Sequence, residues 1–234
     1  MKLNEAKIIG TGSYIPHHIL TNADLENMVD TSDEWIRART GIRERRIADK
    51  NEAASDLAYK ASIKAIEAAK ITPEDLDMII VATITPDMIF PATACILQEK
   101  LGARKIAGFD LEAACSGFLY GLSIGSQFIA TGIYKTILVV AAETLSRITD
   151  WKDRNTCVIF ADGAGAAILT TSHGSSRIIS SYLGADGSGA DLVKVPAGGS
   201  RLPASIETVK NRQHYMTMKG NELFKKAVKM MAQT

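Results

Sequence analysis

The strongest constraint on the fold is a set of continuous apolar runs that alternate with helical patterns. Residues 78–83 (MIIVAT) and 136–143 (TILVVAAE) show no alternation of polar and apolar side chains. Strands that are apolar on both sides are typical of a parallel sheet covered by helices on both faces. Between these runs, residues 92–101 and 116–132 have helical patterns, and residues 105–110 have that of a strand. The sequence therefore predicts an α/β fold.

The rest of the chain gives further predictions for secondary structure. Thr31 and Glu34 match a capping box, with Thr31 as the N-cap of a short helix that carries Trp35. Strands are predicted over residues 7–12, 158–160, 164–171 and 177–183, helices over 55–69 and 221–232, and a loop over 185–200. Along the chain, the predicted strands and helices first alternate. Paired strands follow, and a further structural segment begins after them.

Composition excludes several classes of protein. The chain has 234 residues, 46% apolar and 23% charged, and its net charge of +1 predicts no nucleic-acid partner. We expect no membrane partner because no run approaches the roughly 20 apolar residues that span a bilayer. The three cysteines are odd in number and far apart, so they predict no disulfide framework. No cysteine or histidine spacing predicts a metal site. These features predict a reduced, cytoplasmic protein.

Cys115 is the best candidate for a reactive group. It lies in FDLEAACSGFLYGL, where a predicted strand meets a predicted helix. The partial positive charge of a helix N-terminus favours the thiolate, which is the nucleophilic form of cysteine. The alternative is a small buried apolar side chain. Small neighbours favour the nucleophile, because they let a substrate approach a tight turn. Cys95 and Cys157 lie within apolar runs, so we expect both in the core.

Five arginines around Gly41 form the main cluster of charge. They are Arg37, Arg39, Arg43, Arg45 and Arg46. Such a run predicts a solvated face. The alternative is capture of a phosphate-bearing ligand, with Trp35 stacking on a flat base.

We assign no catalytic or binding role to the Gly-Ala-Gly segment or to the histidines. The Gly-Ala-Gly of residues 163–165 follows a strand pattern, but a dinucleotide-binding loop needs a following helix, and residues 166–171 favour a strand. The small residues there predict close packing of strands. The histidines, His17, His18, His173 and His214, lie in predicted loops, and we expect surface positions for them.

Several segments together resemble one enzyme family. GTGSYIP, TNADLENMVDTSDEWIRARTGIRERR, FPATAC, DLEAACSGFLYGL and FADGAGAAIL, in this order, are similar to β-ketoacyl-acyl carrier protein synthase III. The resemblance covers residues 7–232. It implies a thiolase-like fold of two βαβαβαββ halves in α/β/α/β/α layers. Residues 1–172 then form the N-terminal half, and residues 173–234 begin a second half that is incomplete in this chain.

The resemblance also implies roles for individual residues. Cys115 matches the acyl-accepting nucleophile. Trp35 and Arg154 match the pair that sandwiches the adenine of coenzyme A. The other matches are Thr31 and Arg39 at its polar and phosphate contacts, Gly220, Asn221 and Phe224 along the pantetheine channel, and Phe90 between a dimer partner and the acyl pocket.

The family reaction is the decarboxylative condensation that initiates type II fatty acid synthesis. The resemblance implies acyl-CoA, most simply acetyl-CoA, and malonyl-acyl carrier protein as substrates, a homodimer and no separate cofactor. The family's catalytic His and Asn and a glycine-rich oxyanion loop lie in segments that have no match in these 234 residues. Loss of one oxyanion donor lowers a rate by about 10²–10³. We therefore expect a truncated form with weak acylation and no condensation.

Two alternatives remain open from the sequence. One is a related thiolase-fold synthase of a polyketide or quinolone pathway, because acyl-pocket shape is poorly encoded in the motifs. The other is a non-catalytic homologue that binds coenzyme A or pairs with another chain.

Overall fold

The computed structural model describes residues 3–232, and these residues group into two compact units. The first unit consists of residues up to 18, residues 48–144 and residues 162–183. The second unit consists of residues 19–47, 145–161 and 184 onwards. Each unit is therefore discontinuous in sequence.

A five-stranded mixed sheet forms the centre of the first unit. Its order is β1-β7-β6-β4-β5. The strands are β1 (Glu5–Tyr14), β4 (Met78–Ala82), β5 (Ala107–Leu111), β6 (Thr136–Thr144) and β7 (Asp162–Ser172). β6, β4 and β5 are parallel, with Ala82 paired to Ala141 on one side and to Leu111 on the other. β7 runs antiparallel to both β6 and β1. The carboxyl ends of the three parallel strands therefore lie along one edge of the sheet.

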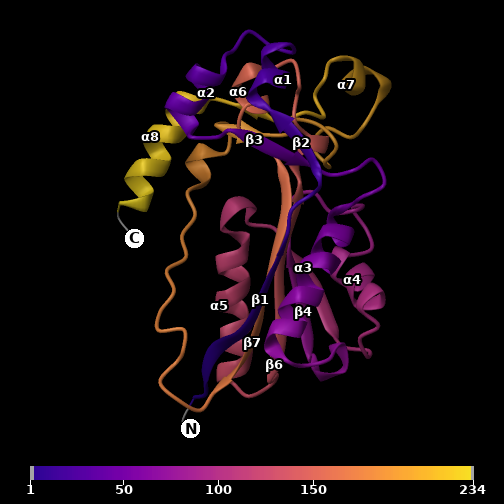
Figure 1. Ribbon diagram of the computed structural model, residues 1–234, viewed down its shortest axis with the longest axis vertical. Helices are drawn as coiled ribbons and strands as arrows, with labels where there is room; N and C mark the ends of the chain where they lie inside the picture. The colour runs from indigo at the N-terminus through magenta and orange to yellow at the C-terminus, as the bar shows by residue number, and fades with distance from the viewer. Residues whose placement is uncertain (1–2, 233–234) are drawn as a thin grey trace. The chain divides into compact units, whose positions relative to one another are not determined.

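Helices cover both faces of this sheet. α3 (Ala54–Ala69) and α4 (Thr93–Leu101) lie on one face, and α5 (Gly117–Ala130) lies on the other (Figure 1). Two apolar clusters fill the two interfaces, and the parallel strands contribute alternate side chains to each: Ile79 and Val81 to the first, Met78 and Ile80 to the second. Because both faces are buried, these strands are apolar throughout, as the sequence predicts.

Glycines seat α5 closely on the sheet. A Cβ at Gly121 would lie 2.7 Å from Cγ1 of Val139, and a Cβ at Gly125 would lie 2.8 Å from Cδ1 of Leu169. A Cβ at either position would force the neighbouring side chain to shift. The spacing of four residues places both on the face of α5 that meets β6 and β7. The first turn of α5, which follows Cys115, therefore has a fixed place on the sheet.

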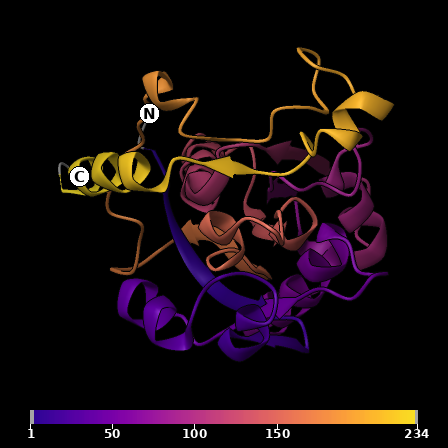
Figure 2. The ribbon, with the colours of Figure 1, turned by 90° about the horizontal axis from the view of Figure 1, so that it is seen from above.

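The second unit is built from short elements. Its helices are α1 (Asn22–Glu26), α2 (Asp33–Thr40), α6 (Arg154–Cys157), α7 (Ile206–Lys210) and α8 (Gly220–Met231), and its strands pair as β2 (His18–Thr21) with β3 (Glu44–Ile47) and β8 (Val193–Lys194) with β9 (Thr217–Met218). Figure 2 shows α8 following directly on β9. An apolar cluster that includes Leu25, Ile36, Cys157 and Val158 packs α1, α2 and α6 together.

Most predicted elements are confirmed, but two predicted strands are wrong. Residues 158–160 follow α6 without forming a strand, because the Ile159 and Phe160 amides donate back to the Thr156 carbonyl at 3.0 and 3.4 Å. Residues 177–183 have no regular structure. The Ile178 amide donates to the Ala6 carbonyl at 2.8 Å, but Ile179 is 87% exposed. An apolar run forms a strand only where a partner strand satisfies its main chain.

Two smaller predictions are also wrong. Ser32, not Thr31, is the N-cap of α2, and its hydroxyl accepts from the Trp35 amide at 3.1 Å. Cys95 is exposed rather than buried, because the buried stripe of α4 passes through Ala94 and Leu97 and leaves Cys95 outside it. Cys157 is buried, as expected.

The predicted division at residues 172 and 173 stays a prediction, since it separates the expected halves of a family fold rather than groups of residues in contact. β7, which ends at Ser172, completes the βαβαβαββ order expected of the first half. No helix among residues 3–232 is long and apolar enough to cross a membrane. Over the same residues, no group of three or more His, Cys, Asp or Glu side chains is arranged to hold a metal.

A candidate thiol site and an aromatic–cation clamp

Cys115 lies at the edge of the sheet where the parallel strands end. β5 ends at Leu111, a single 3₁₀ turn covers Ala114–Ser116, and α5 begins at Gly117. The side chain of Cys115 is exposed. Ligand sites of parallel α/β sheets form outside the carboxyl ends of the strands. The predicted strand-to-helix junction is therefore confirmed, with an accessible thiol at the place where such folds bind substrates.

The residue before the thiol has an unusual main-chain conformation. Ala114 has φ of +44°, the left-handed region that side chains other than glycine rarely adopt. A sharp turn of this kind between a strand and a helix presents a nucleophile at the top of a sheet. Ala114 therefore precedes an exposed thiol in a conformation that is costly for alanine.

A half-buried carboxylate, Glu143, holds the loop that follows β4. Glu143, near the end of β6, accepts hydrogen bonds from the Ile84 amide at 2.9 Å and from the Thr85 hydroxyl at 2.5 Å. The Thr83 amide donates to the Leu111 carbonyl at 3.1 Å, which links this loop to β5. Burial raises the pKa of Glu143, and its hydrogen bonds oppose that rise. Glu143 therefore joins the ends of the parallel strands.

Two further carboxylates fix the remainder of this loop. Asp87 accepts from the amide and the hydroxyl of Ser55 at 2.8 and 2.6 Å. Asp110 accepts from the amides of Thr93 and Ala94 at 2.6 and 2.8 Å, at the N-terminus of α4. Between these anchors the side chain of Phe90 is 84% exposed. An exposed aromatic residue on a well-anchored loop is a candidate for contact with another molecule.

Trp35 and Arg154 face each other in the second unit. The Arg154 guanidinium lies over the indole ring of Trp35, 4.5 Å from its centroid. The Arg39 guanidinium lies 4.8 Å from the same centroid. Arg154 also donates to the Asp30 carbonyl at 2.6 Å. The structure therefore brings together three of the residues predicted to contact coenzyme A. A flat ring with guanidinium groups close to it is suited to aromatic and phosphate-bearing ligands.

The other predicted contacts have less defined surroundings. The hydroxyl of Thr31 is buried and has no hydrogen-bond partner among the described residues. Gly220 and Asn221 begin α8, and Phe224, on its next turn, is 70% exposed. Their placement along a pantetheine channel remains a prediction.

Two functional candidates escaped the sequence analysis. Arg45 is buried, with 2% of its surface exposed, although its cluster predicted a solvated face. It is a β3 residue that points into the core, a direction that charge counting does not reveal. The sequence does contain a clue to Glu143, because a carboxylate at the end of the apolar run TILVVAAE is unusual in a buried strand. His214 is half-buried and bonds to the Thr208 hydroxyl at 2.9 Å, so the expected surface position is wrong there.

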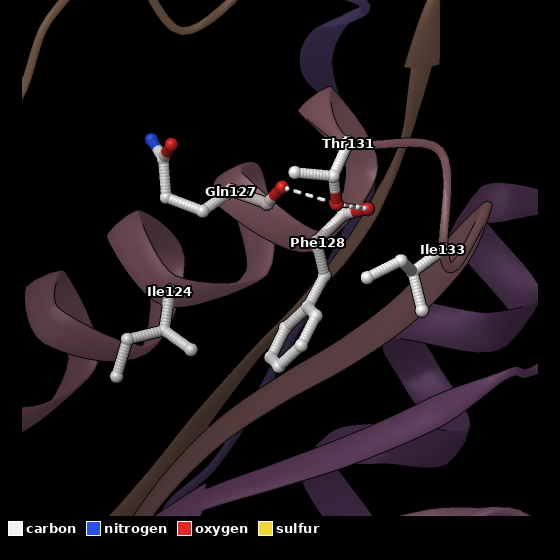
Figure 3. Close-up of a pocket in the computed structure, with 5 residues that line it drawn as sticks. All are labelled: Ile124, Gln127, Phe128, Thr131 and Ile133. Carbon is white, nitrogen blue, oxygen red and sulfur yellow. Dashed lines mark hydrogen bonds between the residues drawn. The ribbon is translucent and has the colours of Figure 1, made fainter.

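A small apolar hollow lies elsewhere on α5. Ile124, Phe128 and Ile133 line it with Gln127 and Thr131, near the end of the helix opposite Cys115 (Figure 3). Its volume of about 260 Å³ is below the roughly 300–1,000 Å³ of most ligand pockets. The Thr131 hydroxyl donates to the Gln127 and Phe128 carbonyls, so it offers no free donor to a ligand. This hollow is not the site of the thiol.

Comparison with known proteins agrees with this geometry. The family model of 3-oxoacyl-[acyl-carrier-protein] synthase III matches residues 109–187, which contain Cys115. The chain is 62% identical over 226 residues to the β-ketoacyl-[acyl-carrier-protein] synthase III of Caldanaerobacter subterraneus, covering 97% of this chain and 68% of that protein. The chain belongs to the β-ketoacyl-[acyl-carrier-protein] synthase III family. The family consists of acyltransferases that catalyse a condensation.

Solved structures of this synthase family give the same result for the fold. The 3-oxoacyl-[acyl-carrier-protein] synthase III of Aquifex aeolicus has a TM-score of 0.84 and 48% identity, over 94% of this chain and 66% of that one. The priming β-ketosynthase of the R1128 polyketide pathway has a TM-score of 0.87 and 32% identity, over 97% and 67%. The fold is therefore the thiolase-like α/β fold of these synthases, and the chain spans about two thirds of the length of these relatives.

Proposed function

We propose that Cys115 accepts the acyl group in a decarboxylative condensation that initiates fatty acid synthesis. The Cys115 thiolate attacks the thioester carbonyl of acetyl-CoA, and coenzyme A leaves as its thiol after taking up a proton. Malonyl-acyl carrier protein then loses CO₂, and its carbanion attacks the acyl-cysteine carbonyl. The carbon–sulfur bond to Cys115 breaks and regenerates the thiolate. The observation that carries this proposal is the exposed Cys115 thiol on a strained turn at the carboxyl ends of β4, β5 and β6.

The clamp of Trp35 and Arg154 supports coenzyme A as the acyl carrier. A purine base can stack on the indole ring, and the guanidinium groups of Arg154 and Arg39 suit its phosphates. The names of the relatives include the acyl carrier protein, which we propose as the other partner. A cytoplasmic location belongs to the same proposal. The three free thiols Cys95, Cys115 and Cys157 support it, because a reducing compartment keeps thiols unpaired.

The two exposed cysteines allow an internal comparison. The protein is incubated with acetyl-CoA, digested, and searched by mass spectrometry for the acetyl increment of about 42 Da that covalent catalysis leaves on a nucleophile. We expect a weak adduct on Cys115 and none on Cys95, which is also exposed. Cys115→Ala should abolish it. Equal labelling of the two thiols would show chemical acetylation without catalysis and would refute the proposal.

A homodimer in which Phe90 reaches the partner belongs to the proposal. Met88, Ile89 and Phe90 form an exposed apolar group with 49%, 92% and 84% of their surfaces exposed. They lie on the loop that joins β4 to α4, and β5 is an edge strand of the described sheet. Sedimentation analysis tests this: Phe90→Ser should weaken self-association, and Phe224→Ser, at an exposed phenylalanine of the other unit, is the matched control.

The similarity to the priming β-ketosynthase favours one second candidate function. At 32% identity and a TM-score of 0.87, a starter-unit synthase of a polyketide pathway has the same fold. The two functions differ in the acyl group that they accept. Competition between acetyl-CoA and longer acyl-CoA thioesters for Cys115, read by the mass of the adduct, separates them.

A further inference from the structure

Arg45 is a buried cation whose partners are neutral. Its side chain donates to the Asn22 side-chain oxygen and to the Val158 carbonyl, and its Nε has no hydrogen-bond partner among the described residues. Burial lowers the pKa of Arg45. Burying a charge without a counter-charge opposes folding. Because burying Arg45 costs stability, we ask which parts of the structure its hydrogen bonds connect.

One branch of the Arg45 contacts holds α6. Val158 is the C-cap of this helix, so the guanidinium lies at the carbonyl end of α6, where the helix dipole favours a positive charge. Arg154 is the first residue of the same helix. With only four residues, α6 has little stability of its own, and its position depends on contacts such as this one.

The other branch holds both ends of α2. Because the Asn22 oxygen accepts from Arg45, the Asn22 amide nitrogen faces its own acceptors, the Asp33 carboxylate at 2.7 Å and the Ile42 carbonyl at 2.9 Å. Asp33 is the first residue of α2, and Ile42 lies just beyond its last residue. One amide group, oriented by Arg45, therefore fixes the start and the end of the helix that carries Trp35.

Arg45 thus connects the two helices that carry the two sides of the clamp. The Arg154 guanidinium lies 4.5 Å from the Trp35 ring, which is direct contact. A flat base between them needs about 7 Å, which is twice the 3.5 Å contact distance of carbon atoms. The side chain of Arg154 is 41% exposed and can move outward. Trp35 packs on the apolar cluster with Ile36 and Val158 and stays in place.

We propose that Arg45 is a positioning residue, which fixes the main chains of α2 and α6 so that a flat base can enter between Trp35 and Arg154 by movement of the Arg154 side chain alone. The ligand class is a purine nucleotide thioester, and this part of the inference rests on the proposed function. The geometric part, that Arg45 holds Trp35 against Arg154, does not depend on any ligand.

The test uses two readouts in the full chain. Trp151→Phe leaves Trp35 as the single tryptophan, since the chain has two. Acrylamide quenching of its fluorescence then reports the accessibility of the indole, and calorimetry with coenzyme A reports binding. In Arg45→Met we expect stronger quenching of Trp35 and a dissociation constant raised about tenfold. Arg46→Met removes the same charge from a neighbour whose partner is Glu44, and both readouts should change less than about twofold.

Arg45→Lys keeps the test decisive where the methionine variant does not fold. Lysine keeps the charge but is shorter and lacks the planar fork that reaches two acceptors at once. We expect a native circular dichroism spectrum, intermediate quenching and a partial loss of affinity. A folded Arg45 variant with the quenching of the unsubstituted protein overturns the positioning role. If the unsubstituted protein does not bind coenzyme A, the proposed function fails. The quenching result still decides whether Arg45 holds Trp35 against Arg154.

Discussion

At the scale of single residues, Ala114 is the clearest source of strain at the thiol. Its φ of +44° is costly for alanine and easy for glycine. We predict that Ala114→Gly raises the free energy of unfolding by about 1 kcal/mol, measured by urea denaturation. The matched control is Ala113→Gly, because Ala113 has a negative φ of −148°, and glycine there should lower stability by about 0.5–1 kcal/mol. Equal effects of the two changes would contradict the strained turn.

The half-buried carboxyl of Glu143 gives a prediction about pH at the same scale. Its pKa in the folded protein is raised above its usual value of 4.5, mainly by burial. As pH rises through 4.5, the unfolded chain therefore loses this proton before the folded protein does, and the folded protein loses stability until its own pKa is passed. We predict that the stability of the protein relative to Glu143→Gln falls as pH rises above 4.5 and then levels off. Denaturation midpoints from pH 4 to pH 8 measure this, and a constant difference would contradict it.

At the scale of elements, regular segments were predictable where burial repeats along the chain. Strands β4 and β6 follow from their continuous apolar runs, and the helices around them follow from apolar periodicity. The thiol turn was predictable because a strand pattern and a helix pattern meet at Cys115. Predictions failed where a distant partner decides: residues 177–183 lack a full partner strand, and Arg45 turns inward to reach Val158. Sequence periodicity carries no information about such long-range partners.

The contact between β1 and α3 gives a prediction about two glycines in neighbouring strands. A Cβ at Gly12 would lie 2.2 Å from the Ala61 carbonyl oxygen and 2.5 Å from the Ala65 nitrogen, which are main-chain atoms that cannot yield. We predict that Gly12→Ala lowers the free energy of unfolding by about 3 kcal/mol or prevents folding. Gly165→Ala, on β7, meets no atom within 4 Å and should change it little. Thermal unfolding of both variants measures the contrast, and similar midpoints would contradict this packing.

The open surroundings of Gly165 also correct our explanation of why β7 has small residues. Close packing of strands was expected around Gly-Ala-Gly, yet a side chain at Gly165 would meet nothing within 4 Å, and a Cβ at Gly163 would make only ordinary contact, 3.5 Å from the Tyr14 carbonyl oxygen. The close approaches occur instead at Gly12, which faces helix α3, and at Gly121, which faces strand β6 of the sheet. A glycine count along a strand does not distinguish these cases, since only the partner surface shows which one is crowded.

At the scale of the whole molecule, the two candidate sites belong to different compact units. The supports of Cys115 (the turn at Ala114, the end of β5 and the seat of α5) come from the first unit, whereas Trp35 and Arg154 are held by residues of the second. Chemistry and nucleotide binding should therefore respond separately to substitution in the free protein. Changes at sites that share no partners usually add in free energy, and coupled sites depart from additivity.

This separation leads to a reciprocal prediction for two variants. Trp35→Ala should leave the alkylation rate of Cys115 by iodoacetamide unchanged within about twofold, with the exposed Cys95 as the internal reference, because no support of the thiol is lost. Cys115→Ala should in turn leave acrylamide quenching of Trp35 unchanged in the Trp151→Phe background. A change in either cross-measurement, in a variant with a native circular dichroism spectrum, would show that the two units are coupled before any ligand binds. Unchanged values would show that each site is supported within its own unit.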